Sequence, residues 1–320
     1  MTTDQPVRVA GRLSGEEAGA VLALADAAAA ADGVFPLSDD VLLRVRHADP
    51  ADDPRAGRPV HLLLDTGDGL AGYACLSRSD PQTAAGELVV HPRSRRRGYG
   101  TALLDAALTA AGPGRTVRFW AHGDEPAARA FAEKNGFVRA RVLWQMRRTL
   151  TTPLPPAPLP PGVTLRHFRP GVDDEAWLGV NARAFADHPE QGRWTGEDLR
   201  LRAAEPWFDP AGFLLAVDIE DKLLGFHWTK VHPAAGGEPA IGEVYVLGVD
   251  PDGHHRGLGG ALAVAGLEYL AGRGLAEAML YVDESNVAAV RLYRRLGFEV
   301  SARDVNYRGP EGRNSASDMG

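Results

Sequence analysis

The sequence predicts a mixed α/β fold that occurs twice, as two domains in tandem. The first observation is an internal repeat: an apolar strand, a basic turn with glycines and then a helix occur near residue 90 and again near residue 250. The second is that a later helix in each copy ends in a Gly-Phe pair, at Gly136 and Gly297. The third is a proline-rich run at 151–162, between the copies. Self-similarity on this scale indicates duplicated structural units.

The length and composition fit two such units. With 320 residues, of which 44% are hydrophobic, the chain is long enough for two ordinary cores. The segment 151–162 cannot propagate a helix or a central strand, so it is expected to be an extended, semi-rigid linker. Domains are therefore expected at 1–150 and 163–308. The polar tail 309–320, rich in Gly and Ser, is expected to be disordered.

Hydrophobic periodicity and turn residues predict the same element order in each half: strand, helix, helix, three strands, helix, strand, helix, strand. In the first half, the alanine-rich stretch 18–31 is expected to be a helix and the apolar stretch 70–76 a strand with Cys75 buried. In the second half, strands are expected at 163–167, 213–217, 223–230, 242–249, 277–282 and 299–305, and helices at 173–186, 195–204, 258–273 and 287–296.

Each glycine turn has the features of a diphosphate site. Glycines let the backbone turn without a Cβ, so that consecutive N–H groups can converge on phosphate oxygens, and the following helix adds its positive end. An ordinary strand-to-helix turn would explain a lone glycine pair equally well. The residues expected to form the two turns are Leu88, Val89, Val90, Arg95, Arg96, Arg97, Gly98, Tyr99 and Gly100 in the first copy, and Leu247, Gly248, Val249, His254, His255, Arg256, Gly257, Leu258, Gly259 and Gly260 in the second.

This pattern resembles the acetyl-coenzyme A motif of the GNAT N-acetyltransferases, in which Arg/Gln-x-x-Gly-x-Gly/Ala follows an apolar strand and opens a helix. The first copy matches from Arg95 to Gly100, whereas the second has His254 where the family prefers Arg or Gln. The resemblance implies two tandem GNAT domains and acetyl-coenzyme A (acetyl-CoA) as cosubstrate, with up to one molecule per domain. The family's second cofactor-binding helix is matched by Asn286, Val287, Ala288, Ala289, Val290 and Arg291.

The two halves differ in the residues that could move a proton. Glu243 lies on the expected fourth strand of the second half, and Tyr293 lies on its last helix. Alignment of the halves on their glycine turns places Ala84 opposite Glu243, and alignment on the Gly-Phe pairs places Ala132 opposite Tyr293. Because alanine cannot exchange a proton, only the second half is expected to be catalytic. Glu87 lies near this position in the first half, and a shifted register would bring it into play.

Acetyl transfer to an amine requires a neutral amine, a polarised thioester carbonyl and a protonated leaving thiolate. Glu243 could accept the amine proton, directly or through a water, while a backbone N–H near Leu247 could face the developing oxyanion. Tyr293 could donate its proton to the departing sulfur. Taken alone, a strand glutamate is most often a surface residue and a helical tyrosine a core residue; the family resemblance favours the catalytic roles.

A narrower resemblance extends over nearly the whole chain. The stretches 185–194, 207–210, 225–233 and 242–249, together with 87–92, 119–123 and 145–148, are similar to actinobacterial tandem acetyltransferases. The acceptor that this implies is the free cysteinyl amine of cysteinyl-glucosaminyl-inositol. The substrate contacts that it implies are Asp39, Glu190, Lys230, Glu243 and Tyr281. Asp39 stands where the family has Glu, and the alternative is that Ser38, Asp39 and Asp40 only begin a helix.

Other function classes fit the sequence less well. The net charge of −7 argues against nucleic acid. His188, His227 and His232 lack a compact ligand spacing, so packing or hydrogen bonding is expected and no metal. A single cysteine allows no internal disulfide, and no signal peptide or membrane span is evident, so a cytoplasmic location is expected. The protein is further expected to be a monomer. The alternatives are an acetyltransferase for another amine, such as an aminoglycoside or polyamine, and a non-catalytic acetyl-CoA sensor.

Overall fold

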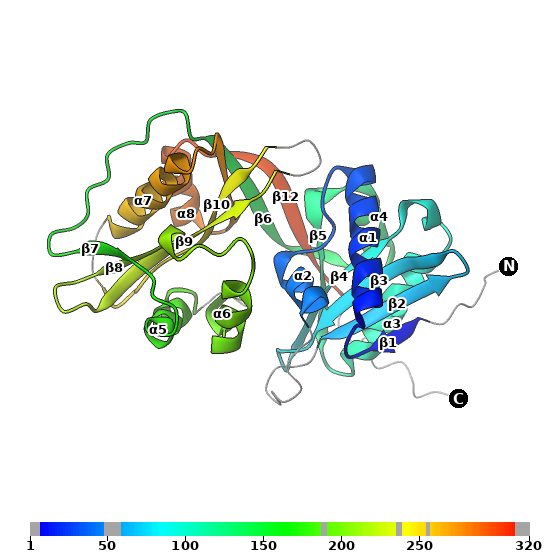
Figure 1. Ribbon diagram of the computed structural model, residues 1–320. Helices are drawn as coiled ribbons and strands as arrows, with labels where there is room; N and C mark the ends of the chain where they lie inside the picture. The colour runs from blue at the N-terminus through cyan, green and yellow to red at the C-terminus, as the bar shows by residue number, and fades with distance from the viewer. Residues whose placement is uncertain (1–6, 48–58, 187–190, 235–238, 254–256, 311–320) are drawn as a thin grey trace. The chain divides into compact units, whose positions relative to one another are not determined.

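The computed structural model describes residues 7–47, 59–186, 191–234, 239–253 and 257–310 (Figure 1). Contacts between residues divide the chain into two compact units. Unit 1 comprises Met1–Leu143 and Ala302–Gly320, and unit 2 comprises Trp144–Ser301. The chain therefore passes between the units twice.

Both halves of the chain have the predicted order of helices and strands. The bounds expected in the second half agree with the structure to within three residues. The first half contains β1 (Arg8–Ala10), α1 (Gly15–Asp32), α2 (Asp39–Arg46), β2 (Val60–Thr66), β3 (Gly69–Ser77), β4 (Thr83–Val90), α3 (Tyr99–Ala111), β5 (Thr116–Ala121), α4 (Pro126–Lys134) and β6 (Val138–Thr149). The second half contains β7 (Thr164–His167), α5 (Asp174–Ala184), α6 (Gly196–Ala203), β8 (Phe213–Val217), β9 (Leu223–His232), β10 (Ile241–Val249), α7 (Leu258–Gly272), β11 (Glu277–Asp283), α8 (Val287–Arg295) and β12 (Glu299–Arg308).

Local sequence signals determine where helices begin and end. The Ser14 N–H donates to Glu17 Oε2 at 2.6 Å and the Glu17 N–H donates back to Ser14 Oγ at 3.2 Å, a capping box that begins α1. Gly33, with φ 74°, ends the same helix in the left-handed region. Thr195 and Asp198 form a second capping box at the start of α6. The free backbone groups at these helix ends are thus satisfied by neighbouring residues.

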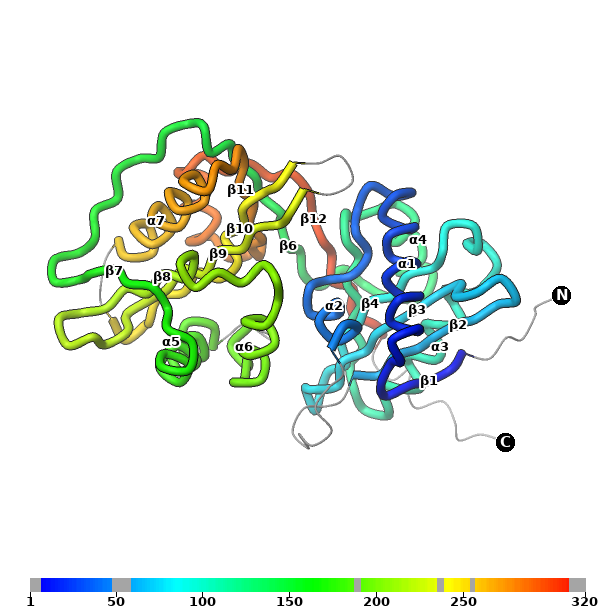
Figure 2. The backbone as a smooth tube through the Cα atoms, in the orientation of Figure 1, coloured from blue at the N-terminus to red at the C-terminus, as the bar shows by residue number. Residues whose placement is uncertain are grey.

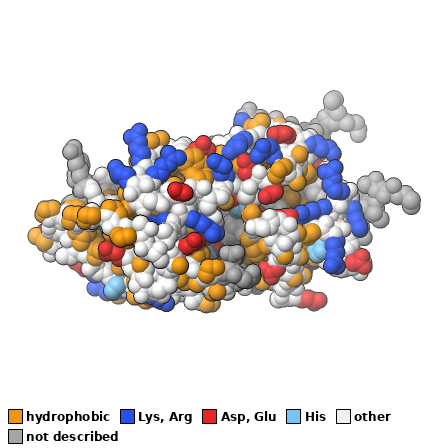
Figure 3. Space-filling model, turned by 90° about the horizontal axis from the view of Figure 1, so that it is seen from above, with side chains coloured by type: hydrophobic (Ala, Val, Ile, Leu, Met, Phe, Trp, Pro, Cys, Tyr) orange, Lys and Arg blue, Asp and Glu red, His pale blue; other side chains and the backbone are white. Residues whose placement is uncertain are grey.

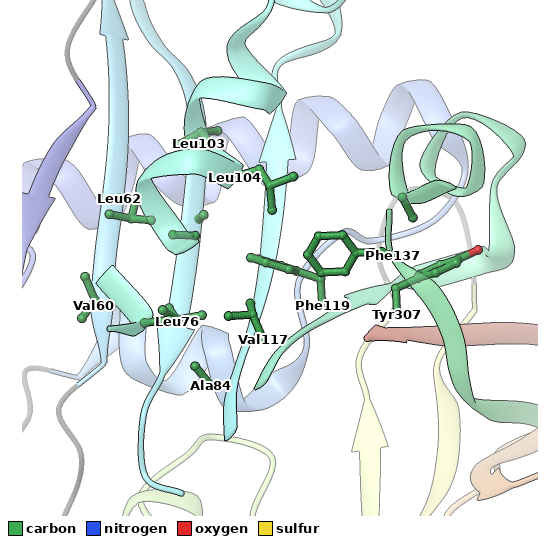
Figure 4. Close-up of a cluster of buried hydrophobic side chains, with 14 of the residues drawn as sticks. Val60, Leu62, Leu76, Ala84, Leu103, Leu104, Val117, Phe119, Phe137 and Tyr307 are labelled. Carbon is green, nitrogen blue, oxygen red and sulfur yellow. The ribbon is translucent and has the colours of Figure 1, made fainter. Parts of the chain in front are cut away.

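Unit 1 is a mixed sheet with helices on both faces. Its strand order is β1-β2-β3-β4-β5-β12, and β4 and β5 are the parallel pair. Leucines of α3, including Leu103 and Leu104, pack on one face of the sheet with Phe119 (Figure 4). Helices α1 and α2 cover the other face, where Tyr73 is buried and where Cys75 is buried as predicted. The glycine turn between β4 and α3 is therefore supported by a packed layer on each side.

Unit 2 repeats this arrangement in the order β6-β11-β10-β9-β8-β7, with β10 and β11 as the parallel pair. Residues of α7 and α8 pack on one face with Leu280 and Phe298. On the other face, α5 and α6 pack on an aromatic cluster around Trp177 and Trp228. The Trp177 and Trp228 rings meet edge to face with centroids 5.7 Å apart.

The last strands of the two halves are exchanged between the units. From Ala302 on, β12 belongs to unit 1 and pairs antiparallel with β5, with Val305 opposite Ala121. From Trp144 on, β6 belongs to unit 2, where it lies beside β11. Tyr307 of β12 is buried in the core cluster that contains Phe119 (Figure 4). The compact units therefore differ from the contiguous domains expected at 1–150 and 163–308. Both halves end in a strand, and hydrophobic pattern does not specify which sheet such a strand joins.

The linker 151–162 contains no helix or strand, as predicted, but it is packed along unit 2. Leu154 and Ala157 contact the cluster beneath α7 and α8, and Leu159 contacts a cluster that includes Leu258 and Leu262 of α7. Figure 2 shows the segment running from β6 past α7 to β7. The linker thus forms part of unit 2. In the expected tail, residues 311–320 lie outside the described residues.

A histidine whose side chain is 15% exposed helps to fix β12 in unit 1. His122 Nδ1 lies 3.0 Å from Asp304 Oδ2, and the Gly123 N–H donates to Asp304 Oδ1 at 3.0 Å. His122 Nε2 lies 3.5 Å from Glu87 Oε1. Burial by itself lowers the pKa of His122, but the hydrogen bonds and charges of Asp304 and Glu87 outweigh it and raise the pKa to about 10. His122 is therefore expected to be an imidazolium ion between two carboxylates at neutral pH.

This arrangement predicts a pH-dependent stability. Because the folded pKa of His122 exceeds its unfolded value of about 6.5, its contribution is fully present below about pH 6.5 and is lost as pH rises through about 10. His122→Gln should lower the unfolding free energy by about 3–5 kcal/mol at pH 6.5, since it leaves two buried carboxylates unpaired. Urea unfolding of wild type and variant between pH 6.5 and 10 measures the loss of unfolding free energy and its change with pH. Wild-type and variant curves that stay parallel with pH would contradict the assignment.

Candidate active site

The second glycine turn joins β10 to α7. Gly257 caps α7 with φ 89°, a left-handed conformation, and a Cβ built on it would meet nothing within 4 Å. Glycine is thus required by backbone conformation rather than by crowding. The first N–H groups of α7, at Leu258, Gly259 and Gly260, have no partner within the helix, as at any helix start. Together with the helix dipole they fit a diphosphate. His254, His255 and Arg256 lie outside the described residues.

Strands β10 and β11 part just before this turn. Their parallel pairing covers Gly242, Glu243 and Val244, whereas β10 continues beside β9 to Val249. Beyond Val244, the edge of β10 that faces β11 therefore lies outside this pairing. The predicted segment Leu247, Gly248 and Val249 is in that part of β10. On the far side of the opening, the Asn286 side chain caps α8 by accepting from the Ala289 N–H at 3.1 Å, and 287–291 form the first turns of that helix.

The first glycine turn has the same backbone geometry but a different electrostatic arrangement. Gly98 caps α3 with φ 88°, and the parallel pairing of β4 with β5 ends at Gly86. However, Arg95 donates to both carboxylate oxygens of Asp32, at 2.7 and 2.6 Å, and to the Val90 carbonyl at 3.2 Å. The guanidinium that the motif assigns to a phosphate is thus paired within unit 1.

Glu243 is buried in β10, immediately before the strands part. It is 5% exposed and lies opposite Lys230 of β9 and Met279 of β11. Directly opposite residues share a face of a sheet, so Glu243 and Lys230 lie on the same side. Glu243 Oε2 lies 2.6 Å from His232 Nε2. Packing or hydrogen bonding was expected of His232, and this contact confirms it. The partner, Glu243, was not predicted; the signal for it is the position of His232 two residues after Lys230 on one strand.

Lys230 lies in a buried aromatic setting. Its Nζ is 4.9 Å from the Trp207 ring centroid and 5.3 Å from that of Tyr245. Tyr245 is the extra residue of a bulge in β10, where the register with β9 shifts between Val244 and Val246. Its hydroxyl accepts from Arg202 Nε at 3.0 Å. The bulge thus directs an aromatic ring at the lysine beside Glu243, and cation–π contact holds the ammonium group there.

The two tyrosines named in the sequence occupy different settings. Tyr293 of α8 is 7% exposed, and burial raises its pKa to about 12, so it carries its proton at neutral pH. Its ring meets Phe298 at 5.8 Å. Tyr281 is 41% exposed, and its hydroxyl accepts from Gln145 Nε2 of β6 at 2.9 Å. Gln145 in turn accepts from the Ser301 hydroxyl at 3.1 Å.

The structure says less about the two remaining predicted substrate residues, Glu190 and Asp39. Glu190 and His188 lie outside the described residues. Asp39 is the first residue of α2, after the cap Ser38, as the alternative interpretation expected, and the adjacent Asp40 is 3.0 Å from Arg44 Nε. His227 is buried against the Leu262 carbonyl at 2.7 Å, as predicted, and burial lowers its pKa to about 4.

The sheet register shows what stands at the Glu243 position in unit 1. Gly72 lies opposite Val90, just as Gly225 lies opposite Val249. Counted from these pairs, Ser77 corresponds to Lys230 and Ala85 to Glu243, because only β10 contains the bulge. The match with Ala84 was therefore wrong by one residue, since sequence alignment does not register a bulge. Ala84 is in the core on the opposite face.

Glu87 does not take the position in unit 1 that Glu243 has in unit 2. It is 3% exposed, accepts from the Ser38 N–H at 2.7 Å and faces His122. Glu87 thus stabilises the start of α2 and, through His122, the position of β12 in unit 1. An alanine at the position that corresponds to Glu243 thus distinguishes unit 1 from unit 2.

Other kinds of site find no support in the described ranges. No cluster of three or more His, Cys, Asp or Glu placed to hold a metal occurs among the residues that the structure describes. None of the described helices is long and apolar enough to cross a membrane. On the face shown in Figure 3, Lys and Arg side chains lie among Asp and Glu side chains, so that face presents both signs of charge.

Comparisons with known proteins support the fold. The acetyltransferase (GNAT) family matches residues 180–298, and an acetyltransferase (GNAT) domain matches residues 58–139. A GCN5-related N-acetyltransferase from Sphaerobacter thermophilus has a TM-score of 0.66 at 28% identity, over 97% of this chain and 98% of its own. A tandem GNAT protein from the clavulanic acid biosynthesis pathway has the same fold, with a TM-score of 0.70 at 21% identity over 95% and 99%.

The fold and the glycine-capped helices therefore define a tandem GNAT N-acetyltransferase, a class of enzyme that uses acetyl-CoA. Two curated relatives narrow the family. The mycothiol acetyltransferase of Salinispora arenicola is 59% identical over 92% of this chain and 94% of its own, and that of Thermobispora bispora is 58% identical over 94% and 99%. The chain belongs to the mycothiol acetyltransferase family.

Proposed function

We propose that the protein transfers the acetyl group of acetyl-CoA to the cysteinyl amine of cysteinyl-glucosaminyl-inositol (desacetylmycothiol), giving mycothiol and coenzyme A, and that unit 2 performs the chemistry. The observation that carries this proposal is the position of Glu243: buried on β10 where the strands part, beside a glycine-capped helix, with alanine at the matching place in unit 1. The family supplies the acceptor, since relatives at up to 59% identity are named for mycothiol.

The residues of unit 2 have the chemistry that this reaction requires. The bound thioester supplies an electrophilic carbonyl and a thiolate leaving group. Glu243 takes the proton from the amine as its nitrogen bonds to the carbonyl carbon. A backbone N–H near Leu247, beyond the end of the β11 pairing, faces the developing oxyanion. Tyr293, which carries its proton at neutral pH, donates it to the sulfur as the carbon–sulfur bond breaks.

Recognition of the acceptor is proposed to use Lys230, Tyr281, Glu190 and Asp39 as well as Glu243. Lys230 is held by its aromatic neighbours, and Tyr281 is exposed with its hydroxyl fixed by Gln145, so both groups are preorganised. The first glycine turn is proposed to bind a second acetyl-CoA molecule without chemistry.

The test of this function is the selectivity of thiol release. Purified protein and acetyl-CoA are incubated with desacetylmycothiol, glucosaminyl-inositol, a polyamine and an aminoglycoside. The highest kcat/KM is expected for desacetylmycothiol, because only this acceptor has both the cysteinyl amine and the sugar hydroxyls. Preference for the polyamine or aminoglycoside would identify an acetyltransferase for another amine. Binding of acetyl-CoA without turnover of any amine would identify a sensor.

A separate expectation concerns Asp39. Asp39→Ala should raise KM for desacetylmycothiol by about 10-fold, as for one lost charged hydrogen bond, but should leave KM for a truncated cysteinyl amine unchanged. The matched control is Ser38→Ala, which removes the helix cap and should lower stability by about 1 kcal/mol without selectivity between acceptors. If Asp39→Ala behaves like this control in both assays, Asp39 is only part of the helix start.

A further inference from the structure

His232 is the described residue whose side chain contacts the carboxylate of Glu243. It ends β9, opposite Ile241, and its Nε2 lies 2.6 Å from Glu243 Oε2. The register places His232, Lys230 and Glu243 on the same side of the sheet. The Glu243 side chain is 7% exposed, whereas that of His232 is 30% exposed. One end of this pair is therefore buried at the proposed reaction centre, and the other reaches solvent.

A buried base must lose its proton to water before the next turnover. Glu243 has little solvent contact of its own. The side-chain nitrogen of Lys230, its other neighbour on β9, lies against the rings of Trp207 and Tyr245. Histidine, by contrast, accepts and releases protons near neutral pH through two separate nitrogens. His232 thus has the chemistry, the contact and the exposure that a proton exit requires.

We propose that His232 is a positioning residue that orients the Glu243 carboxylate and carries its proton to solvent. This inference rests on the proposed function, in which Glu243 is the base. As the amine nitrogen bonds to the acetyl carbon, its proton passes to Glu243. The proton then moves from Glu243 Oε2 to His232 Nε2, restoring the carboxylate and forming an imidazolium ion. Loss of the Nδ1 proton to water or buffer leaves a neutral imidazole with its remaining proton on Nε2. Exchange of this proton to Nδ1 through solvent restores the tautomer that can accept from Glu243 in the next turnover.

The experiment compares wild type, His232→Gln, Glu243→Gln and the double variant, with acetyl-CoA and desacetylmycothiol. Glutamine can hydrogen-bond to Glu243 but cannot accept its proton. We expect His232→Gln to lower kcat on the order of 10-fold or more, with KM for acetyl-CoA unchanged. Added imidazole at constant pH and ionic strength should restore part of this kcat, since a small base can replace the relay. The matched control is His167→Gln on β7, an exposed histidine of unit 2, which should behave as wild type.

The double variant separates this inference from the proposed function. If His232 acts through Glu243, adding His232→Gln to Glu243→Gln should cause no further loss, and imidazole should not rescue either protein. A wild-type kcat in His232→Gln, with Glu243→Gln inactive, overturns the relay but leaves Glu243 as the base. The relay is also overturned if imidazole does not restore kcat in His232→Gln and the double variant loses kcat by the product of the two single losses. A wild-type kcat in Glu243→Gln refutes the base assignment and this inference together.

Discussion

Glu243→Gln is expected to lower kcat by about 10²- to 10⁴-fold, the range for loss of a positioned general base. Glutamine keeps the size and polarity of the buried side chain but has no basic oxygen, so the fold and acetyl-CoA binding should be preserved. Stopped-flow measurement of thiol release gives kcat, and calorimetry gives acetyl-CoA affinity. A large loss of affinity together with kcat would show instead that Glu243 supports the cofactor site.

Tyr293→Phe, in the same assay, removes only a hydroxyl. A comparable loss of kcat is expected, because this hydroxyl is the proposed proton donor to the leaving sulfur; burial raises its pKa to about 12. The ring contact with Phe298 does not involve the hydroxyl and should persist. The matched control is Tyr269→Phe on α7, whose hydroxyl donates to Asp209 at 2.6 Å and has no proposed role in the reaction.

Single-turnover kinetics decide whether chemistry limits the rate. If Tyr293→Phe keeps the wild-type single-turnover rate when chemistry limits that rate, the thiolate leaves unprotonated or takes its proton from water. If Tyr269→Phe loses as much kcat as Tyr293→Phe, the loss reflects disturbed packing of unit 2 rather than a missing acid.

Much of the fold was predictable because each half repeats one local pattern. The glycines at 98 and 257 required a left-handed turn before a helix, and both have it. The periodic apolar strands around them were found within three residues of their expected bounds in the second half. These features depend on neighbouring residues in the chain, which a single sequence shows directly.

Features that depend on pairing between distant segments were not predictable. The exchange of β6 and β12 depends on contacts such as that of Asp304 with His122, which lie 182 residues apart. Because Tyr245 is an extra residue in β10, the residue of unit 1 that corresponds to Glu243 is Ala85, whereas sequence alignment indicated Ala84. Likewise, the sequence marked Arg95 as a phosphate ligand, but only the fold brings Asp32 against it.

Comparison of Gly257→Val with Gly98→Val tests the assignment of catalysis to unit 2. Both glycines cap a helix, with φ 89° and 88°, and both have open space around a built Cβ. Valine therefore introduces the same strain of about 1–3 kcal/mol at each turn without a steric clash. Because the perturbations match, a difference in activity reports the role of each turn rather than the size of the change.

The decisive measurement is turnover of desacetylmycothiol by these two variants over a range of acetyl-CoA concentrations. Gly257→Val should lower kcat/KM for acetyl-CoA by about 100-fold, since misplaced N–H groups no longer bind the diphosphate. Gly98→Val should keep kcat within about twofold of wild type and lose only the acetyl-CoA bound by unit 1, as counted by calorimetry. Equal losses of kcat/KM in the two variants would contradict the assignment of catalysis to unit 2.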